Sequence, residues 1–250
     1  MAESISLYPF MSMNTRPTYG IDAPRVGAMI VLVVAAMAVA AVLLPHSSNP
    51  ALRSVGGIIR SLLPTGTLIL ILIFLYVTVE KFRHRDRMLN MLSWKGSERV
   101  LDVGTGKGLL AIGAAKRLID GKSVGIDIWN KKDLSGNSQE AVLRNARLEG
   151  VIDCMEIREA DARSLPFEDG TFDYVLSNLC IHNIKDEKER SQACREIARV
   201  LKPGGTALIS DYRYTQEYAA SFQGEGLVVT RRYSLLVAPL ILFIVKAVKK

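Results

Sequence analysis

Residues 100–108 read VLDVGTGKG, and this stretch decides the fold. An apolar run leads into Asp102, and Gly104, Gly106 and Gly108 then follow two residues apart. A turn with so few side chains lets a ligand approach the backbone closely. The residues that follow, GLLAIGAAKRLID, have helical spacing, so the turn is predicted to join a buried strand to the start of a helix.

Strand-like and helix-like segments alternate from this point onward. The strand-like segments are ERVLDVG (98–104), KSVGIDIW (122–129), CMEIREAD (154–161), TFDYVLSNLCI (171–181) and TALISDY (206–212). Helix-like segments lie between them at 108–120, 139–150 and 186–205. This order predicts an α/β, Rossmann-like fold with a mostly parallel sheet, helices on both faces, and a ligand at the carboxyl ends of the strands.

The last apolar stretch, residues 227–250, allows two interpretations. We favour two final strands joined through Ala238-Pro239. The alternative is a third membrane-seeking segment over Leu235–Val245, but its 11 residues are short for a span and include a proline.

The spacing of the glycines helps to distinguish a dinucleotide site from a site for a ligand that carries an amino-acid moiety. A dinucleotide fingerprint is GxGxxG, whereas this loop is GxGxG, with Leu109 at the position of the third dinucleotide glycine. The carboxylate of Asp102 would repel a diphosphate but would suit an ammonium group. The helix N-terminus behind the loop would suit a carboxylate. The loop therefore favours an amino-acid moiety, and an amino acid joined to a nucleoside describes S-adenosylmethionine.

Two further acidic residues agree with a nucleoside. Asp127 closes the second strand, 19 residues after Gly108, where it could accept hydrogen bonds from both ribose hydroxyls. Asp161 closes the third strand, where it could accept from an adenine amino group.

With these motifs in order, the region from Glu98 to about Tyr212 resembles the class I S-adenosylmethionine-dependent methyltransferases. It is most similar to the group that includes the quinone-biosynthesis C-methyltransferases and the arsenite methyltransferases. The matching motifs are VLDVGTGKG, VGIDIW, EADARSLPF, FDYVLSNLCIHNI and LKPGGTALISD. The resemblance covers roughly half of the chain and implies a seven-stranded sheet with the last strand antiparallel.

The resemblance also implies roles for individual residues. The loop would hold the methionine moiety, Asp127 the ribose, Ile128 the adenine face, and Asp161 with Ala162 the adenine edge. Asn178 would line the transfer site. The cofactor-binding residues expected in this way are Asp102, Gly104, Thr105, Gly106, Gly108, Asp127, Ile128, Asp161, Ala162 and Asn178.

His182 is the best candidate for a general base, with Asp211, Tyr212 and Tyr214 as possible partners. A base is needed only where the methyl acceptor must lose a proton. The alternative is that His182 shapes the pocket. Three isolated cysteines without metal-ligand spacing predict neither a metal site nor a disulfide framework.

Two apolar runs precede the catalytic region, at residues 26–44 and 61–79. Each is about as long as a helix needs to cross the hydrocarbon of a bilayer. We expect a transmembrane hairpin over 26–79, preceded by an N-terminal tail (1–25) and followed by a basic juxtamembrane linker (80–97) and the catalytic domain (98–250). A cleaved signal peptide and two buried core helices are the alternatives.

Basic residues predict the orientation of the hairpin. KFRHRDR (81–87) carries four Lys/Arg, whereas the connecting loop holds only Arg53 and Arg60. The positive-inside bias favours a cytoplasmic tail and catalytic domain, and the basic cluster could also rest on anionic headgroups. The net charge of +7 is not gathered into a stripe, so no nucleic-acid partner is expected.

The sequence therefore predicts an integral membrane enzyme that moves a methyl group from S-adenosylmethionine to a small, lipophilic or membrane-associated acceptor. One alternative is methylation of a membrane-associated protein. Another is a membrane-tethered module that binds the cofactor without turnover. The sequence carries no signal for the oligomeric state.

Overall fold

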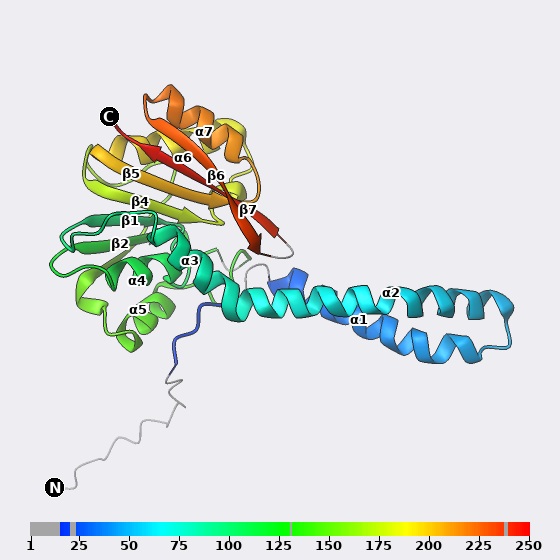
Figure 1. The fold of residues 1–250 in the computed structure, drawn as a ribbon. Helices are drawn as coiled ribbons and strands as arrows, with labels where there is room; N and C mark the ends of the chain where they lie inside the picture. Colours follow the sequence, from blue (N-terminus) through cyan, green and yellow to red (C-terminus); the bar gives the residue numbers. More distant parts are fainter. Residues whose placement is uncertain (1–15, 21–23, 131, 238–239) are drawn as a thin grey trace, which may run out of the picture.

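The computed structural model describes residues 16–20, 24–130, 132–237 and 240–250. A globular α/β part carries a long two-helix rod that projects away from it (Figure 1). The globular part begins earlier in the chain than the sequence motifs indicate, because segments on both sides of the rod pack onto it.

A seven-stranded sheet forms the centre of the globular part, in the order β3-β2-β1-β4-β5-β7-β6. The strands are β1 (Arg99–Val103), β2 (Lys122–Asp127), β3 (Met155–Glu159), β4 (Phe172–Asn178), β5 (Leu201–Asp211), β6 (Val228–Val237) and β7 (Leu240–Val248). Neighbouring strands from β3 to β5 pair in parallel, and β7 runs antiparallel to both β5 and β6. The predicted mostly parallel sheet and its antiparallel last strand are confirmed, and so is the strand interpretation of the C-terminal stretch. The join at 238–239 lies outside the described residues.

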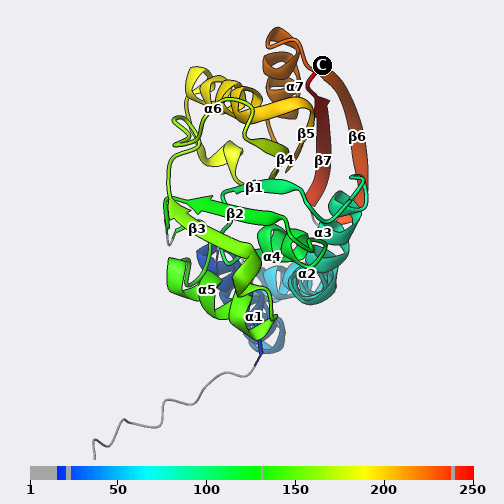
Figure 2. The same cartoon turned by 90° about the vertical axis from the view of Figure 1, so that its left-hand side faces the viewer.

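Helices cover both faces of the sheet (Figure 2). They are α3 (Lys81–Leu89), α4 (Leu109–Ala115), α5 (Gln139–Leu148), α6 (Glu187–Val200) and α7 (Thr215–Gly224). Adjacent residues of β1 point to opposite faces: Val100 packs in a cluster with α3, and Leu101 in a cluster with α6 and α7. The alternation of the sequence thus gives a core on each side of the sheet.

The expected linker at 80–97 is wrong for residues 81–89, which form α3. Met88 and Leu89 are fully buried against β1, β4 and β5. Lys81 and His84 are also buried, whereas Arg83 and Arg87 are exposed. Of the four Lys/Arg of the basic cluster, Lys81 is therefore built into the fold, Arg85 is partly buried, and Arg83 and Arg87 are exposed.

The rod consists of α1 (Pro24–Leu43), a short 3-10 turn (Leu44–His46) and α2 (Pro50–Leu75). A π-helical turn (Tyr76–Glu80) connects α2 to α3. The second helix begins 11 residues before the predicted start at Ser61, so Arg53 and Arg60 lie on α2 and not in a loop. Pro64 lies inside this helix without ending it.

Two glycines of α2 pack closely against the preceding part of the rod, one against the 3-10 turn and one against α1. A methyl group added at Gly56 would lie 2.8 Å from Leu44 Cβ, and one added at Gly66 would lie 3.1 Å from Val34 Cγ2. Most large apolar side chains of the rod point outward, for example Leu32 (70% exposed) and Phe74 (65% exposed). Within the described residues, two helices are long and apolar enough to cross a membrane.

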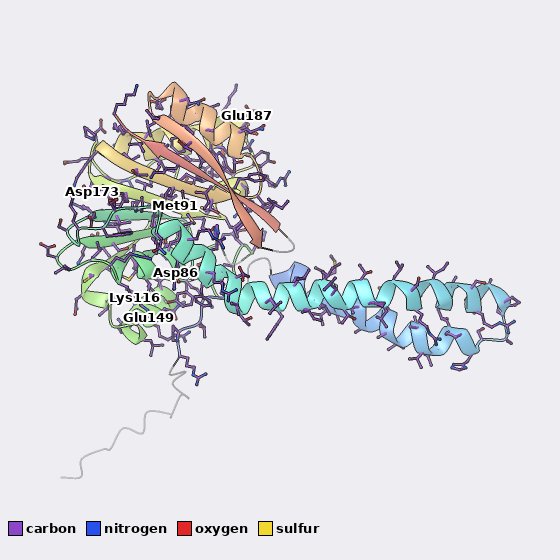
Figure 3. All side chains as sticks on the ribbon, in the orientation of Figure 1. Asp86, Met91, Lys116, Glu149, Asp173 and Glu187 are labelled. Atoms are coloured by element: carbon purple, nitrogen blue, oxygen red, sulfur yellow. The ribbon has the colours of Figure 1, made fainter. Side chains whose placement is uncertain are left out.

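Residues 16–20, which we call the N-terminal strap, run over α5 just before the rod begins. The Thr18 N–H donates to Asn145 Oδ1 (3.0 Å), and Asn145 Nδ2 donates back to the Thr18 carbonyl (2.9 Å). The Tyr19 hydroxyl donates to Glu149 Oε1 (2.7 Å). Glu149 also pairs with Lys116, labelled beside it in Figure 3, and so ties the strap to the ends of α4 and α5.

Candidate functional site

A cavity of about 690 Å³ lies at the carboxyl ends of β1, β2 and β4. Strand β1 lies between β2 and β4, so the strand order reverses direction at β1. In α/β folds, ligands bind at the carboxyl ends of the strands beside such a reversal. Nine of the predicted site residues line it: Asp102, Gly104, Thr105, Gly106, Asp127, Ile128, Asp161, Ala162 and Asn178. Two others, Gly108 and His182, do not.

The glycine-rich loop leaves β1 in a conformation that glycine adopts readily. Gly104, Gly106 and Gly108 have φ values of +75°, +55° and +87°. Gly104 also packs against Cys180, because a Cβ at Gly104 would lie 2.2 Å from the Cys180 sulfur. Gly108 caps α4 and packs against Ile112. The φ of +87° suits the entry into the helix, and the expected contact of Gly108 with the ligand stays a prediction.

Asp102, near the end of β1, binds both the glycine-rich loop and the start of α4. Its Oδ2 accepts hydrogen bonds from the Thr105 hydroxyl (2.9 Å) and from the Ala111 N–H in the first turn of α4 (2.9 Å). Burial raises the pKa of the Asp102 carboxyl to about 7, although both hydrogen bonds oppose this rise. The carboxyl group lines the cavity, so its predicted interaction with a ligand ammonium stays a prediction.

The raised pKa of Asp102 has a consequence for stability. An unfolded aspartate titrates near pH 3.9, so between about pH 4 and 7 the native state binds more protons than the unfolded state. Stability therefore falls as the pH rises through this window. We expect the free energy of unfolding to fall by about 4 kcal/mol more in the wild type than in an Asp102→Asn variant. Urea unfolding at each pH measures this, and parallel profiles would contradict it.

Asp127 holds the other side of the loop. Its Oδ2 accepts from the Gly106 N–H (2.9 Å), and its Oδ1 accepts from the Trp129 N–H (2.7 Å) and from Asn137 Nδ2 (3.1 Å). A carboxylate oxygen accepts about two hydrogen bonds, so Oδ2 keeps one acceptor site for a ligand and Oδ1 keeps none. The prediction that Asp127 accepts from both ribose hydroxyls therefore needs a second acceptor.

Asn137 presents a second acceptor at the cavity, which the sequence did not indicate. It is buried, it lines the cavity, and its Oδ1 has no hydrogen-bond partner among the described residues. It lies in the polar segment that follows β2, residues 130–138, outside the sequence motifs. Leu134 of the same segment touches Gly106, so this segment covers the glycine-rich loop.

Asp161 and Ile128 lie at the adenine end expected from the motifs. The Asp161 carboxylate is already paired with the Arg163 guanidinium (2.6 Å), whose hydrogen bonds lower the pKa of Asp161. Arg163 also pairs with Glu189 on α6. Ile128 is 58% exposed at the cavity wall, so it is not a core residue and is available for packing against a flat ring.

His182 lies beside the cavity and not on its wall. Its Nδ1 lies 2.9 Å from Asp211 Oδ1, and its ring packs edge-on against Tyr212. The expected partnership with Asp211 and Tyr212 is confirmed, whereas Tyr214 packs against Arg190. The role of His182 as a base stays a prediction, which the pH dependence of turnover in a His182→Gln variant would test.

Residues from outside the sequence motifs complete the cavity. Tyr19 of the strap and Lys81 of α3 both line it. His84 of α3 is buried, with Nε2 2.7 Å from the Ser210 hydroxyl of β5, and burial lowers the pKa of His84 to about 4. The two ends of the rod therefore join the globular part at the cavity.

These residues fit S-adenosylmethionine. The cavity volume is in the range of small-molecule sites. The glycine-rich loop leaves room for a backbone contact, and Asp127 and Asn137 present acceptors where a ribose would lie. The Oδ1 of Asn178 is likewise buried without a hydrogen-bond partner among the described residues, at the end of β4. Unpaired buried polar atoms are costly unless a ligand satisfies them.

Comparison with known proteins agrees with this fit. Residues 101–209 match the family model described as a methyltransferase domain. The ubiquinone/menaquinone biosynthesis C-methyltransferase UbiE of Geobacter sulfurreducens is 36% identical over 131 residues, which is 52% of this chain and 48% of that protein. The protein of the same name from Ruegeria sp. is 30% identical over 128 residues, or 51% and 48%. The chain thus spans about half the length of these curated relatives.

Among solved structures, an S-adenosylmethionine-dependent methyltransferase from Aquifex aeolicus has the same fold. It superposes with a TM-score of 0.54 at 20% identity, over 66% of this chain and 89% of that chain.

Proposed function

Because residues 101–209 form a class I S-adenosylmethionine-dependent methyltransferase domain, we propose that the chain is a membrane-anchored enzyme that methylates a small lipophilic acceptor. One observation carries this proposal. The wall of the cofactor cavity includes Tyr19 and Lys81, which stand just before and just after an apolar helical rod. If the rod is inserted in a membrane, this connection would hold the cofactor cavity at the membrane surface.

The surface of the rod supports a bilayer as its surroundings. At a rise of about 1.5 Å per residue, the 20 residues of α1 extend about 30 Å, close to the thickness of the hydrocarbon core. Large apolar side chains cover the outside of both helices. A soluble core helix would bury such side chains, and a signal sequence would not require the second apolar helix that packs against the first.

The contacts at the base of the rod support the proposed topology. The strap binds α5 through Thr18 and Tyr19, and α3 is built into the sheet through Met88 and Leu89. Both ends of the hairpin are therefore held by the same globular part, as a two-span anchor requires. Arg83 and Arg87 are exposed at the end of the rod that joins the globular part. By the positive-inside bias, these basic residues favour a cytoplasmic position for the globular part.

The lipophilic acceptor follows from the anchor and from the relatives. Two of the similar proteins carry names that place them in ubiquinone and menaquinone biosynthesis. An anchor confines the site to the membrane surface and raises the effective concentration of molecules dissolved there. Isoprenoid quinone precursors and other amphiphilic metabolites belong to this class.

Methyl transfer from S-adenosylmethionine does not require the protein to form a covalent bond with the substrate. The bound cofactor supplies a methyl group activated by a sulfonium. The chain contributes positioning and the exclusion of water, and it holds the ribose and the amino-acid moiety in fixed places through the loop, Asp127 and Asn137. His182, held by Asp211, would take a proton from an acceptor that must lose one.

Incubation of the full chain with methyl-labelled S-adenosylmethionine and native membranes tests the proposal. We expect the label in the lipid extract. Label in the protein pellet would favour methylation of a membrane-associated protein. Binding of S-adenosylhomocysteine without label in either fraction would favour a module without turnover.

Excision of the rod tests the anchor separately. Deletion of residues 1–90 would also remove α3 and the strap, and with them Met88, Leu89 and Tyr19. Residues 24–75 are better replaced by a linker of about eight Gly/Ser residues, which is long enough because Lys81 Nζ lies 2.8 Å from the Gly20 carbonyl.

We expect the excised variant to bind S-adenosylhomocysteine as the wild type does and to label membrane lipids at least about tenfold more slowly at equal enzyme concentration. The binding measurement is the control for correct folding. Undiminished labelling of lipids by the excised variant would contradict the role of the anchor.

A further inference from the structure

We propose that the tip of the β6–β7 hairpin enters the headgroup region of the bilayer beside the rod. The tip comprises residues 234–237 of β6 and 240–242 of β7. This inference rests on the proposed function, because it takes the rod as a membrane anchor. It assigns to the catalytic domain a second contact with lipid, on a segment outside the cofactor motifs.

The first observation is the sequence of the hairpin. Residues 233–245 read YSLLVAPLILFIV and contain no acidic or basic side chain. Arg231 and Arg232 precede this stretch, and Lys246 follows it. An apolar segment between basic residues, with a tyrosine at its boundary, is typical of a segment that meets lipid. The stretch is too short to cross a bilayer, and the structure forms it into two strands.

The second observation is that the hairpin extends beyond the neighbouring strand. β5 ends at Asp211, which pairs with Phe243 of β7. Among the described strands, residues 240–242 therefore pair with β6 alone. At a rise of about 3.4 Å per residue, these three residues carry the tip about 10 Å past the carboxyl end of β5. This distance is comparable with the thickness of the headgroup region on one side of a bilayer.

The third observation is that one face of the tip is packed and the other is not. Leu242 is fully buried against Leu179 and Tyr212. Its neighbour Ile241 points to the opposite face of the strand and is 64% exposed. A single exposed isoleucine is ordinary on a protein surface, so the position of this residue decides its meaning.

The tip lies beside the junction of the rod with the globular part. Figure 1 shows the hairpin ending next to the place from which α1 and α2 project, and Figure 2 shows it beside α3. Ile244 of β7 belongs to the same core cluster as Met88 and Leu89 of α3, and Lys246 Nζ donates to the Met91 carbonyl (3.2 Å). Because α3 continues from the rod, a bilayer that holds the rod would lie next to the tip.

The charges of the hairpin favour a bilayer over a protein partner. Arg231 and Arg232 pair with Val245 and Ile244, so they stand behind the tip, toward the centre of the sheet. A tip among the headgroups would therefore place two basic residues at the level of the phosphates, each worth about 1 kcal/mol near an anionic surface.

A tip in the bilayer has a consequence for the methyl acceptor. Leu242 packs on Leu179, and Leu179 lines the cofactor cavity. The tip would therefore bring this wall of the cavity next to the headgroups. A lipophilic acceptor would then reach the site from the membrane without crossing bulk water.

Tryptophan fluorescence of the full chain in vesicles tests the inference. The vesicles contain phosphatidylcholine and anionic phosphatidylglycerol, with or without bromine near the headgroup end of the acyl chains. Ile241→Trp places a reporter at the tip. Val228→Trp is the matched control at the far end of the same hairpin, where Val228 is 51% exposed. The wild-type emission, from Trp94 and Trp129, is subtracted.

We expect brominated lipid to quench the added emission of Ile241→Trp at least about twofold and that of Val228→Trp by less than about a tenth. Equal quenching of the two reporters would overturn the inference. A blue shift of the Ile241→Trp emission without quenching would also overturn it, because the tip would then pack against protein, such as a second copy of the chain. Binding of S-adenosylhomocysteine by each variant is the control for folding.

A third reporter separates this inference from the proposed function. Leu32→Trp lies on the exposed surface of α1. Quenching of Leu32→Trp without quenching of Ile241→Trp would overturn the contact of the tip and leave the anchor standing. No quenching of Leu32→Trp would instead overturn the membrane anchor itself.

A photoactivatable lipid makes the same comparison on the wild-type chain, so the result does not depend on the folding of a variant. A diazirine near the headgroup end of an acyl chain reacts with its neighbours on illumination. Trypsin then releases the tip within residues 233–246 and the far end of the hairpin within residues 214–231. We expect lipid adducts on the first peptide and not on the second. A first peptide without adducts would contradict the inference.

Discussion

Replacement of Asp127 by alanine will reduce the affinity for S-adenosylhomocysteine by more than about 100-fold. The carboxylate accepts three hydrogen bonds, from the Gly106 N–H, the Trp129 N–H and Asn137 Nδ2. Its loss leaves three donors unpaired at the site, each at a cost of about 1–3 kcal/mol, and removes an acceptor for the ribose. Calorimetry with the purified chain measures the change.

Asp133→Ala is the matched control for this experiment. Asp133 belongs to the segment that follows β2 and lines the same cavity, and burial raises the pKa of its carboxyl. No N–H of the glycine-rich loop depends on it, so we expect its removal to change the affinity less than about fivefold. Equal losses in the two variants would mean that net negative charge in the cavity, and not the hydrogen bonds of Asp127, determines binding.

The second large effect concerns Gly104. A methyl group at this position would lie 2.2 Å from the Cys180 sulfur and 2.5 Å from the Cys180 Cβ, and the backbone φ of +75° disfavours any side chain. We expect Gly104→Ala to lower the free energy of unfolding by about 2–4 kcal/mol, through steric overlap and backbone strain together. The same displacement of the loop should abolish binding of S-adenosylhomocysteine.

A second glycine separates these two causes. Gly150 has a similar φ of +70°, but a methyl group there would meet nothing within 4 Å. Gly150→Ala therefore measures the backbone cost alone, which we expect to be about 1 kcal/mol, without an effect on binding. If urea unfolding gave the same loss of stability for both variants, the proposed overlap with Cys180 would not be the cause at Gly104.

The sequence predicted the sheet and most of the cavity because both depend on local patterns. Strands such as β1 and β4 are short apolar runs between turns, and each ends where a polar side chain is needed. Asp102, Asp127 and Asn178 could therefore be placed at one edge of the sheet without knowledge of any distance. The antiparallel last strand came from the family resemblance and not from the residues themselves.

What the sequence did not predict depends on contacts between distant segments. Helix α3 was taken for a linker because its charged residues dominate its composition. The spacing of Lys81, His84 and Met88, which places all three on one buried face, was the available signal. The strap and Asn137 had no such signal, because their partners lie elsewhere in the chain.

The strap also imposes an order on how the molecule is made. Thr18 and Tyr19 leave the ribosome well before their partners Asn145 and Glu149, which follow 127 and 130 residues later. Contacts so far apart in the chain form late, since the intervening segment must first be synthesised and folded. By then both helices of the rod have emerged. The part of the cavity wall that Tyr19 forms is therefore completed only after the whole rod has been synthesised.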